Sequence, residues 1–156
     1  MSKKILYLDL DGVIADFDKA INSLSSDSGA DQTWSVKVNT VCKENPEIFH
    51  DLPLIDGAIE ATTRLFELFD VYFLSSPMWD MPTSFVGKRH WIEKHFGEAA
   101  RRRLILTYRK DLNIGDYLVD DRLKNGAAEF RGMHIHFGTK QFPNWEVTLK
   151  YLESVA

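Results

Sequence analysis

Cysteine is almost absent from this sequence: Cys42 is the only one among 156 residues. A lone cysteine cannot form a disulfide within the chain, which fits a reducing compartment. No histidine pattern accompanies it. We therefore interpret Cys42 as an ordinary core or cap residue and not as a catalytic thiol.

Long apolar runs are absent as well. The run Ile5–Leu8 is far shorter than the roughly 20 apolar residues of a membrane-spanning helix. With only Lys3 and Lys4 before it, the run is also too short for a signal peptide. We expect a cytoplasmic protein that has no membrane partner.

A basic excess is missing too, because 19 lysines and arginines stand against 23 acids and give a net charge of −4. Duplex nucleic acid requires a positive surface, so we expect no duplex partner. A small anionic substrate stays compatible, since a local site can be positive in an acidic protein. The composition, 44% hydrophobic and 27% charged, is typical of a soluble globular protein.

Strand-like apolar runs alternate with amphipathic stretches along the chain. Strands are predicted at Ile5–Leu8, Val71–Ser75, Leu104–Thr107, Tyr117–Val119 and Met133–Phe137. Helices are predicted at Asp16–Leu24, Trp34–Lys43, Gly57–Phe69, Ser84–Phe96, Leu123–Arg131 and Trp145–Leu152, with a loop at 25–31. This alternation predicts an α/β fold, a three-layer doubly wound parallel sheet within a single domain, 1–156.

The stretch 17–54 carries no strand signal and has a few large aromatics among polar residues. We interpret it as a small helical cap insert over the sheet. If the first strand lies between the second and fourth, the switch point of the sheet lies beside the first strand, where such folds bind ligands.

Two acids follow the first predicted strand, Asp9 and Asp11, with Gly12 behind them. Residues i and i+2 of a strand point the same way, so both carboxyl groups are expected to face one site. Like charges this close need a cation or a shared proton, and Mg²⁺ takes carboxylates together with phosphate oxygens. Taken alone, the short pattern is equally consistent with polar residues ending an edge strand.

Polar groups also stand at the other strand ends. Ser75 is placed to hydrogen-bond a phosphoryl oxygen, although a Ser-Ser-Pro turn is the simpler interpretation. Lys110 is placed to hold a nucleophilic carboxylate and neutralise a phosphoryl group, although an isolated lysine is usually a surface residue. Asp120 and Asp121 supply the second acidic pair that an octahedral Mg²⁺ site needs.

The order of these groups resembles the four motifs of the haloacid dehalogenase superfamily: Asp9 and Asp11, then Ser75, then Lys110, then the pair Asp120 and Asp121. The resemblance implies the Rossmann-like fold of that superfamily. It also implies that Asp9 is the nucleophile and Asp11 the general acid and base.

A closer resemblance, to the 5′(3′)-deoxyribonucleotidases, covers most of the chain. It is carried by the stretches 9–17 (DLDGVIADF), 49–53 (FHDLP), 74–77 (LSSP), 88–93 (KRHWIE), 106–110 (LTYRK) and 118–122 (LVDDR). This resemblance implies a Mg²⁺-dependent phosphomonoesterase that hydrolyses a small nucleotide substrate through an aspartyl-phosphate.

The same resemblance implies that Lys110, Lys88 and a serine hydroxyl lie on the phosphate. Ser76 is preferred over Ser75 because it directly precedes a proline, as in the family's pattern. Tyr108 stands where the family usually has arginine, and it falls beside the expected base pocket.

For the metal, the resemblance implies Mg²⁺ bound by Asp9, by the backbone carbonyl of Asp11 and by one acid of the last pair. Asp121 is preferred over Asp120 in that role.

The aromatics of the insert are candidates for stacking on a base. We expect Phe17 and Phe49 near the base, with a pyrimidine deoxyribonucleotide favoured over a purine because the short cap suggests a small pocket. The alternative is that Phe17, Trp34 and Phe49 form the cap's own small core, and for Trp34 that interpretation is equally good.

Three other functions stay open. One is a phosphatase of another small phosphoester, and one is a polynucleotide 3′-phosphatase, which also carries Asp-Asp-Arg but would call for a less acidic chain. The third is a phospho-receiver or binding module, which needs an acceptor such as Asp9 but no acid/base at Asp11.

Overall fold

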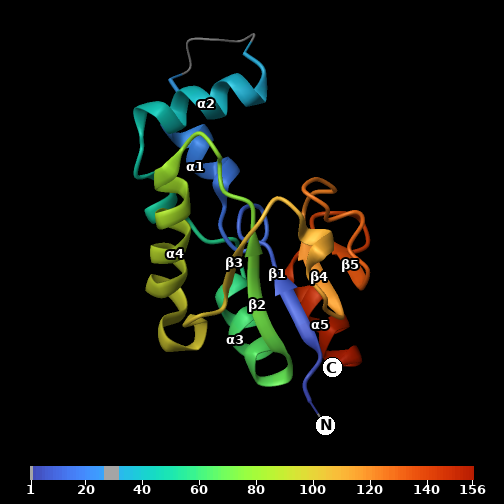
Figure 1. Ribbon diagram of the computed structural model, residues 1–156. Coiled ribbons are helices and arrows are strands. Elements are labelled where there is room, and N and C mark those ends of the chain that lie inside the picture. The colour runs from blue at the N-terminus through green and yellow to red at the C-terminus, as the bar shows by residue number, and fades with distance from the viewer. Residues whose placement is uncertain (1, 27–31) are drawn as a thin grey trace.

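The computed structural model describes residues 2–26 and 32–156 and is organised around a five-stranded sheet (Figure 1). The strands are β1 (Ile5–Leu8), β2 (Asp70–Ser75), β3 (Leu104–Leu106), β4 (Tyr117–Asp120) and β5 (Met133–His136). Their order is β3-β2-β1-β4-β5, and every neighbouring pair is parallel. The chain therefore reverses its direction of travel across the sheet at β1, which puts the switch point where the sequence predicts it.

The first strand is buried on both faces, which explains its continuous apolar sequence. Leu6 and Leu8 are fully buried in the larger core cluster, on one side of the sheet. Tyr7 points the other way and joins a smaller cluster with Leu118 and Phe130. Alternate residues of β1 thus serve two cores, as the pleat of a central parallel strand requires.

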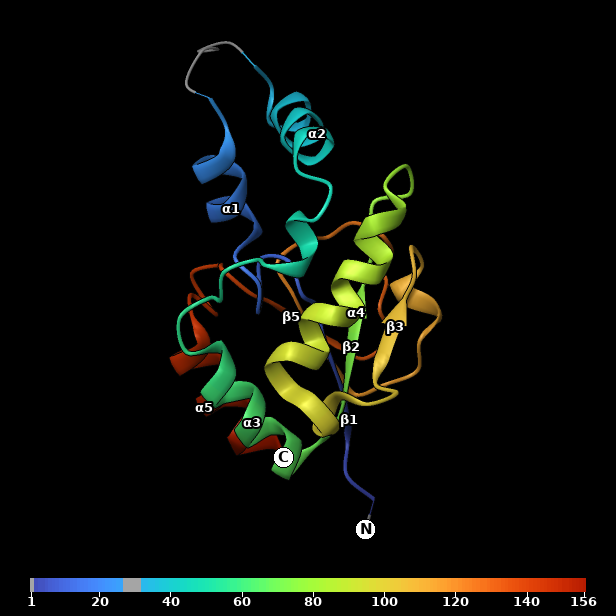
Figure 2. The same cartoon turned by 90° about the vertical axis from the view of Figure 1, so that its left-hand side faces the viewer.

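Three long helices pack on the side of the larger core: α3 (Ala58–Leu68), α4 (Pro82–Phe96) and α5 (Trp145–Val155). Helices α3 and α5 lie side by side (Figure 2). Two buried indoles tie this layer to the loops beside the sheet. Trp91 donates to the carbonyl of Leu52 at 2.8 Å, and Trp145 donates to the carbonyl of Val13 at 2.7 Å.

The helix expected at Leu123–Arg131 is wrong, because this segment folds as a series of turns. Asn125 and Gly126 have φ angles of 54° and 80°, in the left-handed region that a right-handed helix cannot contain. A Cβ on Gly126 would also collide with the Asp111 side chain. The apolar signal had a different cause: Ala127 and Phe130 are buried in the smaller core cluster.

The insert contains α1 (Phe17–Leu24), α2 (Trp34–Glu44) and the short 3₁₀ helix η1 (Ile48–His50). Helices α1 and α2 project beyond the carboxyl ends of the strands (Figure 1). The Asp16 carboxylate starts α1 by accepting the backbone N–H of Lys19 at 3.1 Å. Ser25 and Ser26 begin the predicted loop, whose remaining residues, 27–31, lie outside the described part of the chain.

The two ends of the insert are joined beside β1. The Asp16 N–H donates to the carbonyl of Pro53 at 2.7 Å, and the Ile55 N–H donates to the carbonyl of Ile14 at 2.8 Å. Ala15 forms an antiparallel bridge with Leu54 between these two bonds. The chain therefore leaves and re-enters the sheet domain at one place. Within the described ranges, no helix combines the length and the apolar character that crossing a bilayer requires.

Candidate active site

The site begins at Asp9, the residue that directly follows β1. Its backbone N–H donates to the carbonyl of Val119 at 2.9 Å, which holds it between the central strands. Asp9 is buried, and its Oδ1 accepts a hydrogen bond from the Lys110 ammonium at 3.0 Å. Asp11 lies two residues further on, and both acids line one cavity. The strand end therefore presents two carboxylates to the same space.

Lys110 connects the two acidic strand ends. Its ammonium is buried and also donates to Oδ2 of Asp120, the last residue of β4, at 2.5 Å. The backbone N–H of Lys110 donates to the carbonyl of Asn125 at 2.8 Å, so the turn segment after β4 positions this lysine. One buried cation thus lies between two buried carboxylates, which compensates part of their charge.

The charge of Lys110 does not fully compensate the carboxylates at the ends of β1 and β4. Burial raises the pKa of Asp9, and the Asp120 carboxylate adds to the rise, although Lys110 opposes it. Burial, followed by the charges of Asp9 and Asp120, raises the pKa of Asp121 to about 7. Burial by itself would lower the pKa of Lys110, but Asp9 and Asp120 raise it overall, so the ammonium stays charged.

The arrangement of acids fits a metal ion. Asp9, Asp120 and Asp121 each offer a carboxylate oxygen, and these oxygens lie within 4.8 Å of one another. Oδ1 of Asp121 and Oδ1 of Asp11 are buried and have no hydrogen-bond partner among the described residues. Buried oxygens without a donor carry a large desolvation cost, which a hard cation removes.

Gly12 lets the first acidic motif approach the second. Its φ angle is 82°, which residues with a side chain rarely adopt. A Cβ at this position would collide with the Asp121 carboxyl group. The turn after Asp11 and the carboxylate of Asp121 therefore share a space that only glycine leaves free.

A cavity of about 300 Å³ lies between this edge of the sheet and the insert. Eight of the predicted site residues line it: Asp9, Asp11, Phe17, Phe49, Ser75, Ser76, Lys110 and Asp120. The other lining residues are Trp34, Ser35, Val38, Asn39, Met78, Arg122, Lys124 and Asn125. The cavity thus has acids and Lys110 at its base and residues of α2 and of the turn after β4 among its walls.

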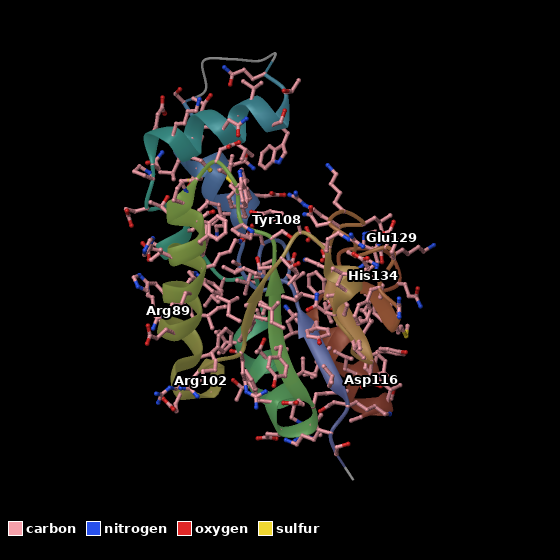
Figure 3. The ribbon with its side chains drawn as sticks, viewed as in Figure 1. Arg89, Arg102, Tyr108, Asp116, Glu129 and His134 are labelled. Carbon is pink, nitrogen blue, oxygen red and sulfur yellow. The ribbon has the colours of Figure 1, made fainter. Side chains whose placement is uncertain are left out.

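Three predicted residues, Lys88, Tyr108 and Asp121, are not among the described residues that line the cavity. Lys88, on α4, is buried with its ammonium 2.7 Å from Oδ2 of Asp11 and 5.0 Å from the centre of the Phe49 ring. Tyr108 lies near the carboxyl end of the sheet (Figure 3), where its ring meets Trp79 edge to face at 6.0 Å.

The two serines differ in how they are held. Ser75 is the last residue of β2 and is buried. The Ser76 hydroxyl donates to the carbonyl of Thr107 at 2.6 Å. A phosphate oxygen can only accept, so Ser76 must turn its proton away from Thr107 to bind one.

The aromatics of the insert divide into two kinds. Phe17 and Phe49 are buried and stack on each other, with ring centres 5.5 Å apart and planes at 15°. Trp34 remains 40% exposed on α2 while lining the cavity. The small-core interpretation therefore fits Phe17 and Phe49, although both also line the cavity. Trp34 is more exposed, and the Lys37 ammonium lies 5.7 Å from the centre of its ring.

Several residues at the site were not predicted. His134 and His136 on β5 hydrogen-bond the backbone carbonyls of Asp120 and Asp121. Their i, i+2 spacing indicates one strand face, but only the register of β5 against β4 brings them to the acids. Ser35, Asn39 and Lys124 lie on segments whose placement depends on the packing of the insert and of the turns.

A parallel sheet with acids at the ends of β1 and β4 and a lysine after β3 defines the haloacid dehalogenase (HAD) type of hydrolase fold. A HAD hydrolase of Bacillus subtilis, provisionally assigned and described as bound to magnesium, superposes with a TM-score of 0.66 at 13% identity, covering 98% of this chain and 100% of that one. A HAD-like hydrolase of Xanthomonas campestris superposes with a TM-score of 0.57 at 10% identity, covering 99% and 96%. The predicted fold class is confirmed.

The sequence places the chain more narrowly. Residues 3–148 match the family described as 5′ nucleotidase, deoxy (pyrimidine), cytosolic type C protein, and the chain belongs to this family. A protein of Vibrio phage KVP40, provisionally assigned as a 5′(3′)-deoxyribonucleotidase, is 45% identical over 97% of this chain and 86% of its own length. The human cytosolic 5′(3′)-deoxyribonucleotidase is 36% identical over 81 residues, 51% of this chain and 40% of that one. The predicted resemblance is confirmed.

Proposed function

We propose that this protein hydrolyses deoxyribonucleoside monophosphates, with Asp9 as the nucleophile and Asp11 as the general acid and base. The observation that carries the proposal is the buried Asp9 carboxylate, which faces a cavity of about 300 Å³ and is held 3.0 Å from Lys110. Family membership and the names of the relatives supply the substrate class.

In the first half of the reaction, an Asp9 oxygen forms a bond to phosphorus and the bond from phosphorus to the leaving oxygen breaks. Asp11 donates its proton to that oxygen, which leaves as the nucleoside hydroxyl. Lys110, together with the hydroxyl of Ser76 or Ser75, stabilises the charge on the transferring phosphoryl group.

In the second half, Asp11 takes a proton from a water molecule, whose oxygen attacks the phosphorus of the aspartyl-phosphate. Phosphate leaves and the Asp9 carboxylate is restored. Lys88 contacts Oδ2 of Asp11 at 2.7 Å, so the proposed role for it is to hold the acid and base as well as to add positive charge near the phosphate.

The proposed metal is Mg²⁺, held by Asp9, by the backbone carbonyl of Asp11 and by Asp121, with Asp120 in the same acidic cluster. When bound, it neutralises carboxylates and phosphate oxygens that would otherwise repel each other. The buried oxygens of Asp11 and Asp121 that lack partners support this assignment.

The insert, residues 17–54, is proposed to act as a cap that selects the substrate. The chemistry at Asp9 does not depend on the leaving alcohol, so selectivity must come from what closes over it. Trp34 lines the cavity with a ring that is 40% exposed and offers it to a base, while the stacked pair Phe17 and Phe49 forms a buried part of the lining. Tyr108 remains a candidate at the rim, beside Trp79. The shortness of the insert supports a preference for a pyrimidine.

The test compares kcat/KM for dUMP, dTMP, UMP, dGMP and a sugar phosphate in the presence of Mg²⁺. We expect the pyrimidine deoxyribonucleotides to be the best substrates, and Asp9→Asn protein, purified in parallel, to be inactive on all of them. Equal hydrolysis of the sugar phosphate and dUMP would refute the nucleotide specificity and leave a general phosphatase.

A further inference from the structure

Two histidines of β5 contact the backbone at the end of β4. His134 and His136 lie on one face of the strand, with ring centres 5.4 Å apart and planes at 25° (Figure 3 labels His134). Nε2 of His134 lies 3.2 Å from the carbonyl oxygen of Asp120, and Nε2 of His136 lies 3.0 Å from that of Asp121. A carbonyl oxygen only accepts, so each Nε2 carries the hydrogen and donates it.

The two carbonyls differ in what else holds them. The Asp120 carbonyl also accepts the backbone N–H of Phe137 at 3.0 Å, the last bond of the ladder between β4 and β5. Beyond it the chain turns away, because the Gly138 N–H donates to the carbonyl of Phe142 at 2.8 Å. In the described part of the chain, the His136 imidazole is the one donor to the Asp121 carbonyl. His134 duplicates an existing bond, whereas His136 supplies a missing one.

The direction of the Asp121 carboxylate depends on how the Asp121 peptide is held. Asp121 is the first residue after β4 and has left the ladder. Its Oδ1 has no hydrogen-bond partner among the described residues, and its carboxyl group packs against the bare Cα of Gly12. The carboxyl group also hydrogen-bonds the backbone N–H of Asp121 itself, so its direction follows from the position of its own peptide.

We propose that His136 is a positioning residue of the metal site: it extends the sheet ladder by one bond and thereby aims the Asp121 carboxylate at Asp9 and Asp120. This inference rests on the proposed function for the identity of the ion, Mg²⁺. Neither histidine belongs to the cluster of possible ligands. The effect of His136 on the metal passes through the Asp121 peptide alone.

The experiment measures Mg²⁺ binding by isothermal titration calorimetry without substrate, in the wild type, His136→Ala, His136→Gln and His134→Ala. The Gln amide can donate to the carbonyl, so it serves as the conservative rescue, and His134→Ala is the matched control on the same strand face. We expect about tenfold weaker binding for His136→Ala, a loss of less than about threefold for His134→Ala, and partial recovery in His136→Gln.

Thermal unfolding with EDTA and with Mg²⁺ separates positioning from general support of the fold. We expect Mg²⁺ to raise the Tm of His136→Ala by less than it raises the Tm of the wild type or His134→Ala. If both alanine variants lower the Tm in EDTA equally and bind Mg²⁺ like the wild type, the histidines only support the fold and the inference is overturned. It is also overturned if the wild type shows no saturable Mg²⁺ binding.

These measurements are independent of the proposed reaction. Failure to hydrolyse any nucleotide, with Mg²⁺ binding that depends on His136 but not on His134, would refute the proposed function and support the positioning role. Nucleotide hydrolysis by the wild type, with Mg²⁺ affinity unchanged in His136→Ala, would support the proposed function and refute the positioning role. If His136→Ala does not fold, His136→Phe takes its place, because phenylalanine keeps a ring of similar size but has no donor. About tenfold weaker Mg²⁺ binding by His136→Phe than by His136→Gln supports the donor role, and equal binding by these two variants overturns it.

Discussion

The ammonium of Lys88 lies 2.7 Å from Oδ2 of Asp11, and the lysine is almost entirely buried on α4. The cap-facing helix thus holds the second acid of the β1 motif from behind. The family resemblance alone assigns Lys88 to the phosphate. The two roles have different kinetic consequences, because holding an acid/base affects the chemical step and binding a phosphate affects substrate affinity.

We therefore predict that Lys88→Met lowers kcat by about 100-fold and changes KM little. Methionine keeps much of the volume of the buried side chain but leaves the Asp11 carboxylate without its ion pair. Steady-state kinetics on dUMP give both parameters. A KM increase with kcat unchanged would instead assign Lys88 to the phosphate. The double variant Lys88→Met/Asp11→Asn should be little worse than Asp11→Asn alone, since the two residues act as a unit.

Asp9→Asn is expected to lower turnover by at least about a thousandfold, because an amide cannot form the acyl-phosphate. The fold should persist, because asparagine is nearly isosteric and also removes like charge beside Asp120. Circular dichroism and the Tm report the fold while phosphate release reports turnover. Near-wild-type activity in a correctly folded variant would show that Asp9 is not the nucleophile.

Asp11→Asn is expected to impair alkyl phosphates, such as nucleotides, more than aryl phosphates. A basic alkoxide needs a proton from Asp11 as it leaves, whereas a phenolate with a low pKa leaves without one. The ratio of kcat/KM for dUMP and p-nitrophenyl phosphate, compared between wild type and variant, measures this. Equal losses on the two substrates would argue against a role for Asp11 as the acid.

In the metal-free protein, burial and then the neighbouring carboxylates raise the pKa of Asp121 from 3.8 to about 7. The folded state then holds this proton more tightly than the unfolded state does. Its contribution to stability is fully present below pH 3.8 and is lost as the pH rises through about 7. We expect the Tm of the EDTA-treated wild type to fall across this window relative to Asp121→Asn, which cannot ionise.

Added Mg²⁺ should reverse that trend, because metal binding requires the ionised carboxylate and gains affinity as the pH rises. Activity should disappear on chelation and return with Mg²⁺, and Asp121→Ala should need more of the ion. Full activity after exhaustive chelation would exclude a metal from the mechanism. A Tm difference from Asp121→Asn that does not vary with pH would contradict the raised pKa.

Trp34→Ala is expected to lower kcat/KM for pyrimidine nucleotides by about tenfold, since stacking on a base contributes about 1–3 kcal/mol. A sugar phosphate should be unaffected. Val36→Ala is the matched control, because Val36 is exposed on the same helix and does not line the cavity. Phe17→Ala is a poorer probe: removing a buried, stacked ring costs about 3–5 kcal/mol of stability and confuses binding with folding. An equal loss in Val36→Ala would indicate a structural effect of α2.

The strand ends were predictable from the sequence because each is a local pattern: an apolar run, then a polar group such as Asp9, Ser75 or Asp120. A parallel sheet brings such ends together whatever the details of packing. The helix expected at Leu123–Arg131 failed because turn geometry at Asn125 and Gly126 overrides a periodicity that the small core also explains.

The predictions for single side chains in the insert and on β5 were less complete. Phe17, Phe49 and Trp34 are all aromatic, and only the packing of α1 against η1 decides which rings stack and which remains exposed. The contact of His136 with Asp121 depends on the register of β4 and β5 and on the turn after β5. Neither can be predicted from the few residues on either side of His136.

The hydrogen bond between the two ends of the insert fixes where the insert joins the sheet domain. Because Asp16 and Pro53 share a hydrogen bond at the base, the segment between them can change in length without moving the strand that leads to Asp9, provided that Phe49 keeps its contact with Lys88. The reacting groups and the groups that choose the substrate are therefore separable parts of the chain. A graft of a longer relative's segment that keeps Phe49 and Leu52 would transfer preference for a base while leaving the carboxylates and Lys110 where they are.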